Sequence, residues 1–310
     1  MKDGRKMSTV RIGVLTSGGD AQGMNAAVRG VVRTALARGA QPYAILEGWQ
    51  GACDGGDSIK RMEWSDVSSI LAEGGTVIGT ARSADFRTYE GRHRAAANLL
   101  EHGIDHLVVI GGDGSLRGAQ LLSEEFGFPI VGLPGTIDND VWGMDYTIGC
   151  DTAANTIIDA INKLRDTASA HRRVVVLEVM GRHCGWLALM SGISGGAEYI
   201  LVPEVAFDLE EISCELKEMY ERGKRYSIIV VAEGAGSGVE IGKIIGEKTE
   251  IDTRVSVLGH IQRGGSPTVE DRIKASMLGE KAALAIISGV SDVIFSFNEG
   301  QVVSVNLFEA

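Results

Sequence analysis

Residues 107–118 read LVVIGGDGSLRG, and this stretch contains the pattern that decides the fold. The apolar run 107–110 has the length of a strand, and the glycine-rich turn 111–115 follows it directly. Continuous apolar strands are typical of a parallel sheet that is covered on both faces. A glycine turn after such a strand favours the start of a helix, so the stretch predicts a βα unit with its loop at the carboxyl end of the strand.

Further apolar runs of strand length extend this pattern along the chain. They occupy residues 12–15, 43–46, 130–133, 174–179, 228–232 and 293–297. After the first of them, an apolar stripe at helical spacing is formed by Met24, Ala27, Val28, Val31, Val32 and Ala35. Buried strands that alternate with amphipathic helices predict a doubly wound α/β fold, which binds ligands at the carboxyl ends of its strands.

Three other glycine-rich loops resemble the one at 111–115. Residues 16–23 read TSGGDAQG and residues 134–140 read PGTIDND. Residues 79–83 read GTARS after the apolar pair 77–78, which is expected to end a strand. A glycine turn that opens a helix presents free N–H groups and the positive end of the helix dipole to an anion. One such loop is often only a tight connection, but four at one edge of a sheet predict a single polyphosphate site. Neither GxGxxG nor GxxxxGKS/T occurs, so the Rossmann and P-loop routes to nucleotide binding are unsupported.

The composition is typical of a globular protein. Of 310 residues, 44% are hydrophobic and 23% are charged, and the formal net charge is −11. An acidic chain disfavours binding to nucleic acid or to an anionic membrane, although local arginines can still bind phosphate. The sequence shows no signal peptide and no membrane span, and its four isolated cysteines are expected to be reduced thiols, which predicts a cytoplasmic protein.

Carboxylates in two of the loops are candidates for chemistry. Asp113 lies between glycines at the end of a strand, where it either contacts Mg²⁺ bound to phosphates or caps the following helix. Asp138 and Asp140 are two residues apart, so an extended segment would point both side chains the same way. One of this pair would serve as a base for a substrate hydroxyl, and the alternative is an Asx-turn.

Basic and polar residues gather at the loops of the second half. Four arginines lie near junctions of strands and loops, namely Arg173, Arg182, Arg254 and Arg263. Guanidinium groups there can hold a phosphate through paired hydrogen bonds, although a single arginine is more often a solvated surface residue. Glu233 follows the run 228–232, where it either accepts from a sugar hydroxyl or caps a helix. For His183 and His260, ligand binding and a structural role both stay open.

In order and spacing, six runs of the chain resemble the phosphofructokinase family. They are GVLTSGGDAQGMNAAVRG (13–30), GTARS (79–83), IGGDGS (110–115), PGTIDNDV (134–141), EVMGRHCG (178–185) and LGHIQRGGSP (258–267). The likeness extends from residue 12 to about residue 279, and TIDND with HIQRGG is highly specific.

The resemblance implies an activity, a cofactor and a fold. The activity is transfer of the γ-phosphoryl group of ATP to the 1-hydroxyl of fructose 6-phosphate, with Mg²⁺ as the cofactor. The fold would consist of two similar doubly wound domains with largely parallel sheets and the active site in the cleft between them. Residues 1–148 with 261–310 would form the larger, nucleotide-binding domain, and residues 149–260 the smaller, sugar-phosphate-binding domain.

The resemblance also implies roles for individual residues. ATP would be bound by Gly19, Arg82, Ser83, Gly112, Asp113, Gly114 and Ser115, with Asp113 also contacting Mg²⁺. The catalytic residues would be Thr136, Asp138 and Arg182, of which Asp138 is the general base and Arg182 stabilises the transferring phosphoryl group. Fructose 6-phosphate would be bound by Thr136, Ile137, Asp138, Met180, Gly181, Arg182, Glu233, His260, Ile261, Gln262 and Arg263. Arg173 and Arg254 would reach its 6-phosphate from a neighbouring subunit, which implies a homotetramer with shared active sites.

Two glycines favour ATP over pyrophosphate as the phosphoryl donor. Pyrophosphate-dependent relatives have GGDD and PKTID where this chain has Gly114 and Gly135. A carboxylate at 114 would crowd the α-phosphate of a nucleotide, and a lysine at 135 would hold a short inorganic donor. The alternatives are the same reaction with pyrophosphate, a ligand-sensing subunit without catalysis, and an oxidoreductase. Retention of Asp113, Asp138 and Arg182 argues against the silent subunit.

Regulation is the least defined part of the resemblance. A basic effector pocket between subunits would be formed by Arg29, Arg33, Arg165, Arg222, Lys224 and Arg225. The loop 51–60 lacks the arginine of bacterial regulatory enzymes and looks more like eukaryotic relatives, which argues against the usual control by ADP and phosphoenolpyruvate. The sequence also ends roughly one helix earlier than common bacterial members, so we expect that last element to be absent.

Overall fold

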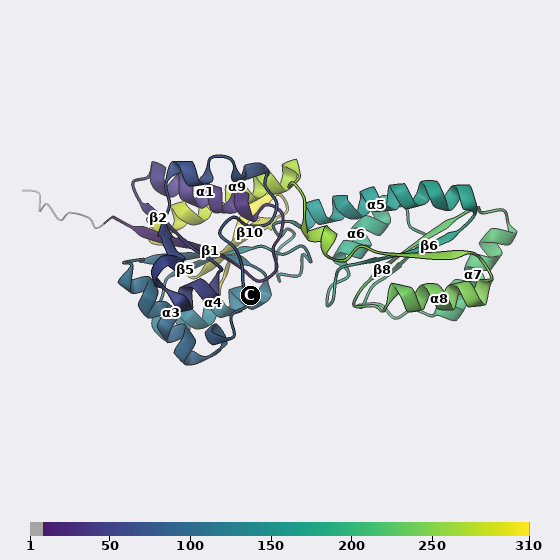
Figure 1. Cartoon of the computed structure of the whole chain (residues 1–310), viewed down its shortest axis with the longest axis horizontal. Coiled ribbons are helices and arrows are strands. Elements are labelled where there is room, and N and C mark those ends of the chain that lie inside the picture. Colours follow the sequence, from purple (N-terminus) through teal and green to yellow (C-terminus); the bar gives the residue numbers. More distant parts are fainter. Residues whose placement is uncertain (1–8, 310) are drawn as a thin grey trace, which may run out of the picture. The chain divides into compact units, whose positions relative to one another are not determined.

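The computed structural model of the chain describes residues 9–309, which fall into two compact units (Figure 1). The first unit contains the described residues up to Thr136, together with Val141–Gly149 and those from Gly265 onward. The second unit contains Ile137–Asp140 and Cys150–Gly264. The expected domain limits, at 148/149 and 260/261, lie close to these borders, but 137–140 belongs to the second unit. What each unit binds stays a prediction.

The first unit is built on a seven-stranded sheet in the order β11-β10-β5-β4-β1-β2-β3. The strands are β1 (Arg11–Ser17), β2 (Gln41–Ile45), β3 (Ile59–Arg61), β4 (His106–Gly111), β5 (Ile130–Pro134), β10 (Val293–Asn298) and β11 (Gln301–Asn306). The five central strands run parallel, and β3 and β11 pair antiparallel at the two edges. Parallel strands buried on both faces require helices on either side.

The helices of the first unit cover both faces of this sheet. In Figure 1, α1 (Met24–Ala37) and α9 (Val269–Ile287) lie on one face, and α3 (Tyr89–Glu101) and α4 (Asp113–Phe126) lie on the other. The short α2 (Trp49–Asp54) packs against α3. Five short 3₁₀ segments occur in the described chain: η1 (Gly56–Ser58), η2 (Trp64–Val67), η3 (Ile70–Ala72), η4 (Asp85–Arg87) and, in the second unit, η5 (Gly259–Arg263).

The second unit has a wholly parallel four-stranded sheet in the order β7-β8-β6-β9. Its strands are β6 (Val174–Val179), β7 (Tyr199–Leu201), β8 (Ser227–Ala232) and β9 (Thr253–Val257). Helices α5 (Cys150–His171) and α6 (Trp186–Gly195) lie on one face, and α7 (Leu209–Glu221) and α8 (Gly238–Thr249) lie on the other (Figure 1). The predicted fold class, two doubly wound units with largely parallel sheets, is confirmed.

Six of the seven apolar runs chosen from the sequence lie wholly on strands, and the seventh, 43–46, extends one residue past the end of β2. One expectation was wrong. Residues 77–78, taken as the end of a strand, lie in a loop without regular structure. Four strands were missed, and each is short or lies at a sheet edge: β3, β7, β9 and β11. Within residues 9–309, no helix is long and apolar enough to cross a membrane, and all four cysteines are free.

Candidate active site

The loops after β1 and β4 lie side by side in the first unit. Ser17 pairs with Gly111 at the carboxyl ends of these neighbouring parallel strands. A Cβ atom placed on Gly18 would lie only 3.1 Å from Oγ of Ser115, so the two loops are in contact. Gly18 has a φ of 89°, which favours glycine at this turn. The loops 16–23 and 111–115 therefore share one edge of the sheet.

The loop after β5 joins the same edge. The N–H of Gly135 donates to the carbonyl of Gly111 over 3.0 Å. A Cβ atom placed on Gly112 would lie 3.4 Å from Cβ of Thr136, so Thr136 lies against the start of α4. Thr147 stabilises this loop, because its Oγ1 donates to the carbonyl of Thr136 over 2.6 Å.

The segment 79–83 reaches this edge without a strand of its own. Thr16 Oγ1 donates to the carbonyl of Gly79 over 2.8 Å, and Thr80 Oγ1 donates to the carbonyl of Gly18 over 2.9 Å. Arg82 is exposed beside these contacts. The loops 16–23, 79–83 and 111–115 and the start of the loop 134–140 thus converge, as the sequence predicted. The segment 79–83 is held there by threonine hydroxyls and not by a strand.

Asp113 is the first residue of α4 and does not cap it. The cap is Gly112, which makes no side-chain hydrogen bond, and Asp113 is exposed. The carboxylate at the start of a 14-residue helix is therefore available to a ligand. Among residues 9–309, no group of three or more His, Cys, Asp or Glu side chains gathers to hold a metal ion. One carboxylate plus phosphate oxygens and water is a normal ligand set for Mg²⁺, so the residues present fit this ion.

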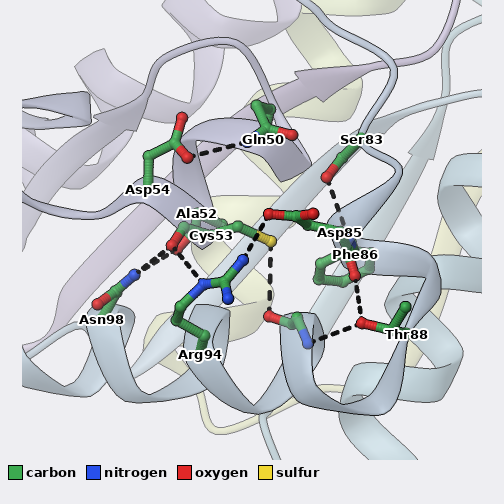
Figure 2. Close-up of polar contacts among 11 residues, drawn as sticks. Gln50, Ala52, Cys53, Asp54, Ser83, Asp85, Phe86, Thr88, Arg94 and Asn98 are labelled. Atoms are coloured by element: carbon green, nitrogen blue, oxygen red, sulfur yellow. Dashed lines mark hydrogen bonds and ion pairs between the residues drawn. The ribbon is translucent and has the colours of Figure 1, made fainter.

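A network of side chains on α3 braces the segment that contains Arg82 and Ser83 (Figure 2). Arg94 donates from Nη2 to Asp85 over 2.6 Å and from Nε to the carbonyl of Cys53 over 3.3 Å. Asn98 donates to the carbonyls of Ala52 and Cys53, both at 2.9 Å, and so satisfies the end of α2. Ser83 Oγ accepts from the N–H of Phe86 over 3.0 Å, which starts η4.

Buried side chains next to this network, Trp49, Phe86 and Cys53, make further contacts. Phe86 stacks on Trp49 with ring centroids 4.1 Å apart. The Cys53 thiol donates to the carbonyl of Gly91, and its burial raises the pKa of that thiol. A thiol kept in the neutral form is a poor nucleophile, so Cys53 has a structural role here.

In the second unit, the loops that follow β6, β8 and β9 are tied together. The N–H of Gly234 donates to the carbonyl of Gly181 over 3.1 Å, which joins the ends of β8 and β6. Gln262 Oε1 accepts from the N–H of Met180 over 3.2 Å, which joins η5 to the end of β6. The side chains of Ile137 and Gln262 are fully buried, so ligand contacts from these two would use backbone atoms.

Asp138 lies in the electrostatic field of the residues predicted to bind the sugar phosphate. Burial is the largest cause that raises the pKa of Asp138, and the Asp140 carboxylate and then Glu233 raise it further. Arg263 and Arg182 lower the same pKa through their positive charges. A half-buried carboxylate with a raised pKa and two nearby arginines has the properties of a general base.

Arg173 and Arg254 lie near the amino ends of their strands, away from the loops at the carboxyl ends. Arg173 immediately precedes β6, and Arg254, in the adjacent strand β9, pairs with Val175 of β6. Both guanidinium groups contact the carboxylate of Asp252. Sequence analysis missed Asp252, although its spacing of two from Arg254 in an extended segment puts both on one face. Thr147 was also missed, and no signal in the sequence marks it.

The six residues predicted to bind an effector belong to different units. Arg29 and Arg33 lie one turn apart on α1, and the buried Nε of each has no hydrogen-bond partner among the described residues. Burial and then the charge of Arg33 lower the pKa of Arg29. In the second unit, Arg222 pairs with Glu218, Lys224 with Glu198, and Arg165 with the carbonyl of Gly195, while Arg225 is exposed. Their grouping into one pocket stays a prediction.

Glycine-rich loops at the ends of parallel strands, an available carboxylate at a helix start and an aspartate with a raised pKa are the features expected of a phosphoryl-transfer enzyme of the α/β class. The phosphofructokinase family model matches residues 11–286. The chain therefore belongs to the phosphofructokinase family.

Individual relatives agree with this assignment. The chain is 56% identical over 299 residues to the ATP-dependent 6-phosphofructokinase of Bacillus licheniformis, covering 96% of this chain and 93% of that protein. It is 57% identical over 279 residues to the Bacillus subtilis enzyme of the same name, covering 90% and 86%. A solved structure of phosphofructokinase from Saccharomyces cerevisiae superposes with a TM-score of 0.92 at 42% identity. That match covers 97% of this chain, which spans 45% of the length of the yeast chain.

Proposed function

We propose that this chain transfers the γ-phosphoryl group of ATP to the 1-hydroxyl of fructose 6-phosphate. The two Bacillus relatives are named for this ATP-dependent activity and match at least nine tenths of the chain. The observation that carries the mechanism is the setting of Asp138, a carboxylate with a raised pKa beside Arg182 and Arg263. Phosphoryl transfer needs positioning and charge stabilisation more than covalent chemistry, and such a setting supplies both.

The donor side belongs to the first unit. The backbone N–H groups of the converging loops, including Gly19 and Gly112, would bind the phosphates of ATP, and Arg82 and Ser83 would line the nucleotide. Asp113 would hold Mg²⁺ with phosphate oxygens as its other ligands. When bound, the ion neutralises charge that develops on the transferring group.

The acceptor side belongs to the second unit. Asp138 would take the proton from the 1-hydroxyl as that oxygen attacks the phosphorus in line. Arg182 would stabilise the charge of the transferring phosphoryl group. Met180, Gly181, Glu233 and the 260–263 segment would bind the sugar phosphate, since their loops are tied together at one sheet edge.

Two subunits would complete each active site. Arg173 and Arg254 are separated from the loop at 180–185 by the length of β6, roughly 20 Å for six residues. Within one chain, these two arginines are too far away to bind a sugar phosphate that is also bound by the loop at the other end of β6. The arginines would therefore serve the 6-phosphate in a neighbouring subunit of a homotetramer.

A cytoplasmic location also stays a prediction.

A donor assay tests the reaction. Steady-state turnover with fructose 6-phosphate is measured with ATP and with pyrophosphate side by side, and then with ADP and phosphoenolpyruvate added. We expect turnover with ATP, and turnover with pyrophosphate alone would refute the assignment of the donor. No turnover with either donor would support the ligand-sensing alternative.

A hybrid assay tests the shared site. The Asp138→Asn variant lacks the base but keeps Arg173 and Arg254, and the doubly substituted Arg173→Met, Arg254→Met variant has the reverse defect. Mixed and reassembled, the two would form some sites with a native base and native arginines, so activity should return. Mixtures no more active than the separate variants would show that each site uses residues of one chain only.

A further inference from the structure

Asp252 lies between two basic residues of the second unit, Arg173, which immediately precedes β6, and Arg254 in the adjacent strand β9. Its Oδ2 accepts from Nε of Arg173 over 2.5 Å, and its Oδ1 lies 3.1 Å from Nη2 of Arg254. The backbone holds this geometry, because the N–H of Val174 donates to the carbonyl of Asp252 over 3.1 Å. The pairing of Val175 with Arg254 fixes the register of the two strands at the same edge.

We propose that Asp252 is a positioning residue that holds the guanidinium groups of Arg173 and Arg254 together for the phosphate of the sugar substrate. This inference rests on the proposed role of the two arginines at the 6-phosphate. Asp252 itself does not touch the substrate and acts through the arginines.

The electrostatics of the three groups support a positioning role. Two guanidinium groups repel each other when they face one phosphate, and a carboxylate between them offsets that repulsion. The hydrogen bond from Arg173 is the largest cause that lowers the pKa of Asp252, so the carboxylate is ionised throughout the neutral range. The triad then has a net charge of about +1, which still attracts a phosphate dianion.

Donor groups are left over for a phosphate. A guanidinium group has five N–H donors, and Asp252 contacts Arg173 only through Nε. Among the described residues, the terminal nitrogens of Arg173 make no hydrogen bond. With its orientation set by Asp252, this guanidinium presents both terminal nitrogens as a fork of the kind that binds phosphate oxygens in pairs.

The side chains of the triad are exposed enough that their ion pairs should order the two arginines without adding much to the stability of the fold. The side chains of Arg173, Asp252 and Arg254 are 25%, 43% and 61% exposed. Ion pairs this exposed contribute little to folding, because water already solvates the charges and salt screens them. Their remaining effect is to order two long side chains before the ligand arrives, which lowers the entropic cost of binding.

Substitution of Asp252 tests the proposal through the KM for fructose 6-phosphate. Asp252→Asn keeps the size and the backbone contact but removes the charge, and we expect this KM to rise about tenfold, the effect of releasing two ordered side chains. The kcat at saturating sugar phosphate, the KM for ATP and the melting temperature should change little. Asp252→Glu, which restores the charge, should recover part of the loss.

Two sets of controls make the result specific. Glu247→Gln removes another exposed carboxylate of this unit, one that lies 3.9 Å from Lys243, and should leave the KM unchanged. Arg173→Met and Arg254→Met should each raise the KM for fructose 6-phosphate. If they do and Asp252→Asn leaves the KM unchanged or lowers it, the positioning role of Asp252 is wrong while the role of the arginines stands. If the arginine variants have no effect, both the role of the arginines and this inference fail.

Discussion

Arg92 on α3 and Glu125 on α4 form a two-pronged ion pair, with Nε and Nη2 of the arginine each 2.6 Å from a carboxylate oxygen. The third nitrogen, Nη1, donates to the carbonyls of Phe86 and Arg87. Arg92 therefore connects the segment after Ser83 to the helix that begins at Asp113. Its contact with α4 is in the last turn of that helix, at the end opposite Asp113.

Arg92→Met should destabilise the protein strongly. Arg92 is 7% exposed, and its removal leaves Glu125 and two carbonyls without these donors in a partly buried place. Loss of hydrogen bonds to a charged group in such a place costs about 1.5–3 kcal/mol. The measurement is the free energy of unfolding in urea, compared between each variant and the wild type. Arg94→Met is the matched control, because its partner Asp85 is exposed and the expected cost is about 0.2–1 kcal/mol. Equal losses in the two variants would contradict this account.

Asp138→Asn should lower activity and raise stability at the same time. Loss of a general base reduces kcat by about 10²–10⁴-fold. Because burial and Asp140 raise the pKa of Asp138, the acidic limb of the wild-type kcat profile should lie at higher pH than for an ordinary aspartate. The Asn variant should lack that limb. Near-normal turnover in the variant would remove Asp138 from the role of base.

The stability change of the same variant follows from proton linkage. A carboxyl whose pKa is raised on folding stabilises the folded state below its unfolded pKa of about 4, and this contribution is lost as pH rises through the folded value. At neutral pH the ionised Asp138 is thus unfavourable in the folded protein, and an amide is not. The melting temperature of Asp138→Asn should exceed that of the wild type at pH 7, with a difference that shrinks toward pH 4. A lower melting temperature at pH 7 would show that Arg182 and Arg263 outweigh burial.

The sequence predicted the sheets and the loops because both are recorded in local patterns. Strands β1, β4 and β5 are continuous apolar runs, and each leads into a glycine turn. Strand β9 was missed because its residues are only partly buried and alternate with exposed arginine and valine. The segment 77–78 was wrongly taken as a strand end, since two apolar residues before glycine look the same in a loop held by threonines.

Relations between distant residues could not be predicted in the same way. Arg92 and Glu125 are 33 positions apart, and Thr147 reaches a carbonyl 11 positions earlier, so no periodicity connects them. The candidate site residues themselves came from motif spacing and family resemblance. Their supports came only from the folded chain, because side chains as different as arginine and threonine donate to these carbonyls, and no residue type or spacing marks them.

Gly114→Asp and Gly135→Lys should affect the enzyme differently. A Cβ atom on Gly114 meets nothing within 4 Å, so aspartate fits the fold and should raise the KM for ATP through charge repulsion with the phosphates. A Cβ atom on Gly135 would lie 2.9 Å from Cε of Met24 and 3.1 Å from Ile110, so lysine needs local repacking that typically costs about 1–3 kcal/mol. Steady-state kinetics and thermal unfolding of both variants measure these effects. An unchanged KM for ATP in Gly114→Asp would contradict the proposed place of the donor.

Thr147→Val should lower kcat more than it affects either KM. Valine keeps the shape of this fully buried side chain but removes the 2.6 Å hydrogen bond to the carbonyl of Thr136, two residues before Asp138. Loss of a buried hydrogen bond costs about 1–3 kcal/mol, and a small displacement of the base is enough to slow the reaction about tenfold. Thr147→Ser keeps the hydroxyl and should retain most of the activity. Thr156→Val, which removes a helix hydrogen bond to Thr152 in α5, controls for a general loss of stability. If Thr147→Val lowers only the melting temperature and leaves kcat intact, the hydroxyl supports the fold and has no part in placing the base.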